Sequence, residues 1–181
     1  MELLVNFLDE HEEIDLAAYR YILFYEDGTK KERPVYKRKF YKGTGIYDVD
    51  KDDYFTAHQN MQIIFRNNKK HYYKPSLVYG EDEYFNTETI MDKKKIGYVY
   101  YAIHYYRKHN SSITSSNNKR DFDKIYDDYY EGLMKKYNNH PLIQTLIVHN
   151  VNWRMNEGFL KEKDLVNIRK NLKKSRFFII W

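Results

Sequence analysis

The chain has 181 residues, no cysteine and a formal net charge of +5. This length suffices for one domain that buries its own core, so we expect a single domain over 1–181. The absence of cysteine excludes disulfides and thiolate metal sites and favours a cytoplasmic location. No apolar run approaches the ~20 residues of a membrane span, and the acidic start of the chain differs from a signal peptide.

Basic residues gather in two segments. Seven lie in 29–42 beside one acid and seven more lie in the last 21 residues, whereas residues 1–20 hold six acids. Clustered basic residues are typical of proteins that bind polyanions, and ordinary solvated surface is the alternative interpretation. The candidate nucleic-acid-binding residues are Lys30, Lys31, Arg33, Lys37, Arg38, Lys39, Lys173, Lys174 and Arg176.

The first part of the chain predicts three strands in a meander. Segment 2–9 is a short apolar run that ends in an acid, and 19–25 is rich in aromatic and β-branched residues. The dipeptide Asp27-Gly28 follows, and it is a strong hairpin signal because both turn residues accept positive φ. The third strand extends toward Tyr41, and 42–48 is expected to be a loop.

The middle of the chain predicts a helix and then a strand. An acidic N-cap and apolar residues at helical spacing indicate a helix over 52–68. Segment 72–80 indicates a strand, with Pro75 near its start.

Five tyrosines and two histidines lie in the stretch 98–110. From an N-cap at Asn86 or Thr87, apolar residues recur at intervals of three and four, which favours a helix of about twenty residues over a strand. The competing interpretation is a strand with alternate residues of 99–105 on one face. We expect the tyrosines to form mainly helix core, with base stacking as the less favoured role. Three are expected nearer the surface: Tyr98, Tyr101 and Tyr105.

The last part of the chain predicts helices on both sides of one ambiguous segment. A polar loop over 110–118 precedes an amphipathic helix over 119–137. Segment 142–150 is apolar enough for an interior strand, although its spacing also permits a helix. A further helix is predicted over 159–172.

This order of elements resembles the ribonuclease H-like fold, an α/β class with a mixed sheet in which a three-strand meander precedes alternating helices and strands. The first strand of that superfamily carries a catalytic aspartate, and Asp9 in V-N-F-L-D-E is similar. Its fourth strand ends in an acid, which Glu81 or Asp82 in L-V-Y-G-E-D-E-Y-F resembles. Asp164 is similar to the aspartate of the last helix, and His149 to the histidine before it.

The resemblance implies that two Mg²⁺ ions promote phosphodiester cleavage. Magnesium prefers oxygen ligands, so carboxylates from distant elements must converge. Gln62 stands where the family has a glutamate, and its uncharged amide should lower metal affinity. The implied metal ligands are Asp9, Glu81, Asp82 and Asp164, and the implied catalytic set adds His149.

Two classes of function follow from the sequence. The first is a metal-dependent endoribonuclease whose basic segments hold phosphates. The second is a non-catalytic inhibitor that binds a protein or nucleoprotein through a basic, tyrosine-rich surface. Small cysteine-free chains rich in Tyr and Lys resemble accessory proteins of phages and mobile elements, among them anti-CRISPR inhibitors of type II systems. That resemblance implies RNA or an RNA-guided nuclease complex as partner, in the cytoplasm of a host bacterium. A transcriptional accessory protein or a structural phage protein is the third alternative.

Overall fold

The computed structural model describes residues 1–32, 40, 42–52, 63–68, 70–75, 80–108 and 126–156. The chain divides into two compact units, Met1–Ser116 and Asn117–Trp181. The first unit is a mixed α and β structure whose sheet has both parallel and antiparallel pairs. Its elements are α1 (Glu2–Glu10), β1 (Leu16–Phe24), β2 (Lys30–Lys31), β3 (Gly45–Asp48), β4 (Ile63–Phe65), α4 (Glu81–Lys93) and β5 (Lys95–Arg107).

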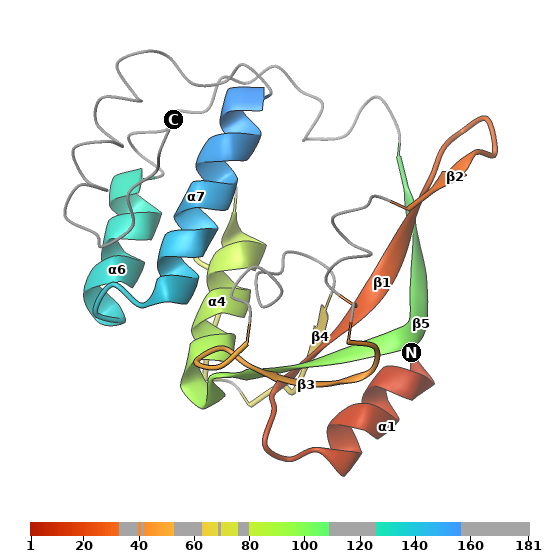
Figure 1. Ribbon diagram of the computed structural model, residues 1–181, viewed down its shortest axis with the longest axis horizontal. Coiled ribbons are helices and arrows are strands. Elements are labelled where there is room, and N and C mark those ends of the chain that lie inside the picture. Colours follow the sequence, from red (N-terminus) through yellow and green to blue (C-terminus); the bar gives the residue numbers. More distant parts are fainter. Residues whose placement is uncertain are drawn as a thin grey trace. The chain divides into compact units, whose positions relative to one another are not determined.

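The sheet is built around the long strands β1 and β5, which run parallel to each other (Figure 1). Its order is β2-β1-β5-β3, and β4 also pairs with β1. β3 pairs antiparallel only with the first residues of β5, as far as Tyr98, and β4 pairs only with Leu16–Ala18. The sheet is therefore wide at the start of β1 and β5 and narrows to β2, β1 and β5 at their ends. We call the narrow part the distal sheet end.

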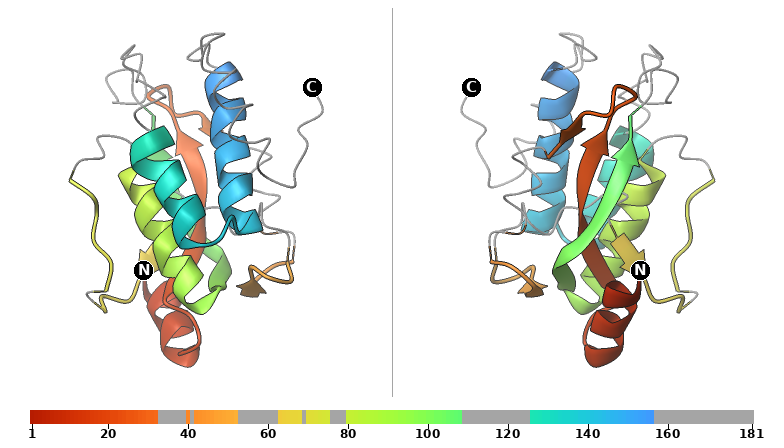
Figure 2. Two further views of the ribbon diagram at one scale, coloured as in Figure 1. Left: turned by 90° about the vertical axis from the view of Figure 1, so that its left-hand side faces the viewer. Right: turned by 90° about the vertical axis from the view of Figure 1, so that its right-hand side faces the viewer.

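Helices α1 and α4 cover opposite faces of the wide part of the sheet (Figure 2). The apolar side of α1 packs into a cluster that includes Ala17 and Val99. On α4, Phe85 packs edge-on to Phe65, with ring centroids 4.7 Å apart. Phe65 pairs with Leu16, the neighbour of Ala17, and successive strand residues point to opposite faces. The contacts of α4 with Phe65 and of α1 with Ala17 are therefore on opposite faces of the sheet.

Close packing under α1 requires a glycine in β5. A Cβ placed on Gly97 would lie 2.5 Å from the Phe7 ring and 2.7 Å from the Ile14 side chain. Both neighbours belong to the buried cluster under α1, so neither has free space to move into. This contact fixes how closely α1 approaches the sheet.

The second unit contains a π-helical turn (Tyr126–Glu131), α6 (Gly132–Lys136) and α7 (Pro141–Asn156). Its buried residues include Leu133 of α6 and Leu146 of α7. The predicted helix over 119–137 is confirmed for its described part, and 142–150 takes the helical alternative. In the described part of the chain, no helix is long and apolar enough to cross a bilayer.

Several predicted elements agree with the structure and others do not. The Asp27-Gly28 hairpin is confirmed: Gly28 has φ +82°, and β1 pairs antiparallel with β2. Segment 2–9 is a helix rather than a strand, so the predicted three-strand meander reduces to this hairpin. Residues 45–48 of the expected loop form β3, and residues 63–65 of the expected helix form β4.

The predicted helix through the tyrosine stretch is wrong. The chain is helical only to Lys93, turns at Lys94 with φ +55°, and continues as the strand β5. Tyr98 is fully buried instead of exposed, whereas Tyr101 and Tyr105 are exposed as expected. Segments 33–39, 53–62, 110–118 and 159–172 lie outside the described residues, and so do most of 72–80 beyond Pro75 and the start of 119–137.

Candidate functional site

Asp9 lies at the end of α1 and not at the end of a strand. The sequence N-F-L-D-E folds as a helix because Leu4, Phe7 and Leu8 repeat at helical spacing and are buried. The Asp9 carboxylate is 68% exposed and lies 3.7 Å from the Arg66 guanidinium. Because exposed ion pairs contribute little, this contact adds only slightly to the stability of the fold.

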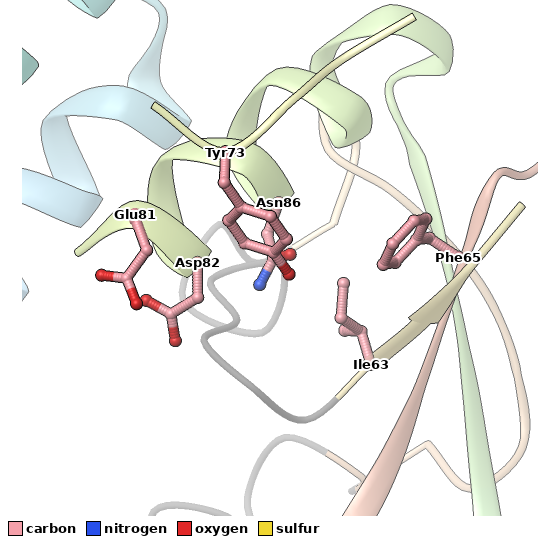
Figure 3. Close-up of a pocket in the computed structure, with 6 residues that line it drawn as sticks. All are labelled: Ile63, Phe65, Tyr73, Glu81, Asp82 and Asn86. Carbon is pink, nitrogen blue, oxygen red and sulfur yellow. The ribbon is translucent and has the colours of Figure 1, made fainter. Parts of the chain in front are cut away.

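Glu81 and Asp82 begin α4, and the end of the strand that was predicted before them falls on 76–79, outside the described residues. Gly80, with φ +83°, precedes the helix, and three acids occupy its first turn. Unpaired N–H groups at a helix start carry partial positive charge and favour acidic side chains there. Glu81 and Asp82 line a pocket of about 380 Å³ together with Ile63, Phe65, Tyr73 and Asn86 (Figure 3).

The pocket has an acidic side and an aromatic side. Figure 3 shows the two carboxylates on one side of Tyr73, with Ile63 and Phe65 on the other. Tyr73 stacks on Phe85 at a centroid distance of 4.8 Å and an interplanar angle of 22°. Phe65 packs edge-on to the same Phe85 ring, which holds the aromatic side in place.

The surroundings of the pocket raise the pKa values of Asp82 and Tyr73. Burial raises the pKa of Asp82, and the nearby Glu81 carboxylate raises it further, although the Glu83 N–H donates to it at 2.8 Å. Burial also raises the pKa of Tyr73, and the charges of Asp82 and Glu81 act in the same direction. Within the described ranges, no Lys, Arg or His pairs with Glu81 or Asp82.

The structure does not show the members of the predicted catalytic set side by side. His149 lies within α7 of the second unit, and Asp164 and Gln62 lie outside the described residues. Where the structure describes side chains, no three His, Asp or Glu groups are placed to hold a metal ion. The implied magnesium site therefore stays a prediction.

The distal sheet end presents a second candidate site. β1 and β5 pair in two segments, Ala17–Tyr19 with Gly97–Val99 and Arg20–Phe24 with Ile103–Arg107. Residues 100–102 are extra on β5, and such irregularities in a strand redirect side chains. Tyr101, in this irregular part, is 77% exposed.

Exposed aromatic and basic side chains gather beyond this irregularity. Tyr105 is 53% exposed, and the Lys30 ammonium lies 4.8 Å from the centre of its ring. Register places Lys30 and Arg107 opposite Phe24, on the same face as Tyr105. We call the following set the aromatic–basic surface: Lys30, Tyr101, Ile103, Tyr105 and Arg107. Lys31 and Tyr106 are opposite Leu23 and therefore lie on the other face.

Neighbouring contacts hold this surface in place. The Arg20 guanidinium donates to both Glu32 oxygens, at 2.9 and 3.2 Å, and lies 4.4 Å from the centre of the Tyr100 ring. Tyr100 in turn packs edge-on to Tyr101, with centroids 5.3 Å apart. Side chains fixed in this way lose less conformational entropy when a ligand binds.

Only part of the predicted basic set can be located. Lys30 and Lys31 form β2 and are exposed, as expected for a binding surface. The other predicted basic residues lie outside the described residues: Arg33, Lys37, Arg38, Lys39, Lys173, Lys174 and Arg176.

Sequence reasoning missed the aromatic side of the pocket. Tyr73 and Phe65 come from two separate segments before α4, and no local sequence pattern indicates their contact with Phe85. A signal did exist for the acids, because glycine followed by three acids is typical of a helix start. No protein-family model, curated protein or solved structure matches this chain.

Proposed function

We propose that the protein binds single-stranded nucleic acid, with a preference for RNA, through the aromatic–basic surface. The observation that supports this most is that one strand carries two well-exposed tyrosines, Tyr101 and Tyr105, with Lys30 beside Tyr105. Unpaired bases stack on exposed aromatic rings, and lysine or arginine beside the rings attracts the backbone phosphates. An exposed surface of this kind has no role in the core.

The same surface also supports the non-catalytic inhibitor expected from the sequence. Exposed tyrosine and arginine are enriched in protein interfaces, and Ile103, 44% exposed, adds an apolar contact. Binding to the guide RNA of a type II RNA-guided nuclease, or to the nucleoprotein, is the specific form of the proposal that follows from the resemblance to anti-CRISPR proteins.

The proposed binding of nucleic acid does not require that the protein cleave it. Cleavage by a Mg²⁺-dependent, ribonuclease H-like site stays a separate proposal, because Asp164 lies outside the described residues. Incubating a structured RNA with the protein, with and without Mg²⁺, separates cleavage from binding. Asp9→Asn should abolish cleavage if that site operates and leave binding intact.

The test of the binding proposal is fluorescence anisotropy with a labelled single-stranded RNA, its duplex and the matching DNA. Replacing Tyr101 and Tyr105 together by Ala should weaken single-strand binding by about tenfold or more, since each stacked base contributes roughly 1–3 kcal/mol. Tyr72→Ala is the matched control, because Tyr72 is 68% exposed and lies outside the surface.

Equal affinity of the wild type and the double tyrosine variant would refute the proposal. Equal loss in the Tyr72 control would also count against it, because the effect would then not belong to this surface. A protein partner captured without RNA, through the same two tyrosines, would favour the inhibitor that binds protein.

A further inference from the structure

We propose that the pocket between β4, Tyr73 and the start of α4 binds one unstacked guanine base. This inference rests on the proposed function, because the base belongs to a bound single strand, but it concerns a separate set of residues. The lining residues come from three parts of the chain: β4, the segment 70–75 and α4. The volume of about 380 Å³ lies within the roughly 300–1,000 Å³ of small-molecule sites.

The aromatic side of the pocket fits a flat ring. Tyr73 and Phe65 both rest on Phe85, so their rings are positioned before any ligand arrives. Proteins that read an unstacked base place it against aromatic or apolar side chains and bind its hydrogen-bonding edge with polar groups. Ile63 and Phe65 supply the apolar contacts of this kind (Figure 3).

The acidic side selects a ligand with hydrogen-bond donors. Many acids of this unit have a basic partner, as Asp15 has Lys93 at 2.8 Å and Asp50 has Lys94 at 2.9 Å. Glu81 and Asp82 have no such partner among the described residues. Ionised carboxylates only accept hydrogen bonds, so a ligand group that hydrogen-bonds to them must donate.

Guanine has the matching donor pattern. Its N1–H and N2–H₂ groups are adjacent donors on one edge and suit a carboxylate acceptor, whereas adenine and cytosine each offer a single amino donor. A guanidinium shares this donor pattern but is small, and it leaves the contacts with Ile63 and Phe65 largely unused. The combination of donors and ring size therefore favours the base.

The test uses free nucleosides, which carry no phosphate and so do not depend on the basic residues. Isothermal titration should show guanosine binding about tenfold more tightly than adenosine, cytidine or uridine, the discrimination expected of one bidentate contact. Asp82→Asn should remove most of this preference, because the amide presents a donor to a donor. Tyr73→Phe should keep binding and Tyr73→Ala should lose it.

Control variants separate this inference from the proposed function. Asp50→Asn changes an acid outside the pocket and should leave guanosine binding unchanged. The Tyr101→Ala and Tyr105→Ala double variant should retain guanosine binding while losing RNA. Equal binding of all four nucleosides, or guanosine binding that Asp82→Asn leaves unchanged, overturns the inference. Tighter binding of methylguanidinium than of guanosine also overturns it and assigns the pocket to an arginine side chain.

Discussion

At the residue scale, Asp82 combines a helix-start position with partial burial, and these have opposite effects on its charge. The helix start favours a carboxylate, but burial dominates and raises its pKa. A raised folded pKa means that stability falls as pH rises through the ordinary value of 3.8 toward the folded value. At neutral pH the ionised Asp82 is therefore a cost to the folded state.

Asp82→Asn should consequently stabilise the ligand-free protein at about pH 7, by on the order of 0.5 kcal/mol. The gain should disappear at about pH 3, where the wild-type carboxyl is also neutral in both states. Urea denaturation at the two pH values measures the difference. A variant that is less stable than the wild type at neutral pH would contradict this prediction. It would show that the Asp82 carboxylate stabilises the folded state.

The charges of individual residues predicted side-chain exposure better than the sequence patterns predicted where residues lie in the fold. Lys30 and Lys31 are exposed, as their charge indicated. Tyr101 and Tyr105 are also exposed, but that expectation came from a helical spacing that is wrong, and the same spacing placed the buried Tyr98 near the surface. The placing of Asp9 failed, because it depended on whether 2–9 was helix or strand. A short apolar run fits both periods, and tertiary contact with the sheet decided for the helix.

At the element scale, the boundary between α4 and β5 determines where the tyrosines lie. Apolar spacing continues from the helix into the strand, so 86–106 was expected to form one helix. The break falls on Lys94 itself, and Gly97 shortly after it was the local sequence signal against a continuous helix. The strand has 13 residues, longer than usual, and its Tyr, Val and Ile content was the available signal for it.

Lys94 ends α4 in the left-handed region with φ +55° and ψ +25°, which is costly for a residue with a Cβ. Lys94→Gly should therefore raise the free energy of unfolding by about 0.5–1 kcal/mol, after the greater freedom of glycine in the unfolded chain is subtracted. Thermal and urea denaturation provide the measurement.

Lys94→Ala is the matched control for this prediction. Both variants lose the exposed ion pair with Asp50, but only glycine removes the Cβ. If the alanine variant gains as much as the glycine variant, the ion pair and not the backbone accounts for the change.

At the scale of the whole molecule, the net charge of +5 and the two candidate sites predict two different responses to salt. Binding of an oligonucleotide releases counterions, so its affinity should fall by about 0.7 logarithmic units per phosphate contact for each tenfold rise in salt. Guanosine has no phosphate, so its affinity for the pocket should stay nearly constant. Titrations over a series of salt concentrations compare the two.

Replacing Lys30 and Lys31 by Ala extends this comparison. The slope for RNA should become shallower, whereas the guanosine affinity should not change. If both affinities fall in parallel with salt, the pocket is responding to the general field of the protein rather than to the donors of the base, and the two sites are not independent.

The three-residue offset between the two pairing segments of β1 and β5 divides β5 into two parts with different packing constraints. Before the offset, Gly97 and Tyr98 are fixed by packing against α1 and by neighbours in the core. After the offset, the exposed residues from Ile103 to Arg107 have few such packing contacts. Mutations there can accumulate without unfolding the chain, so the distal end can change its partner while the scaffold beneath is inherited intact.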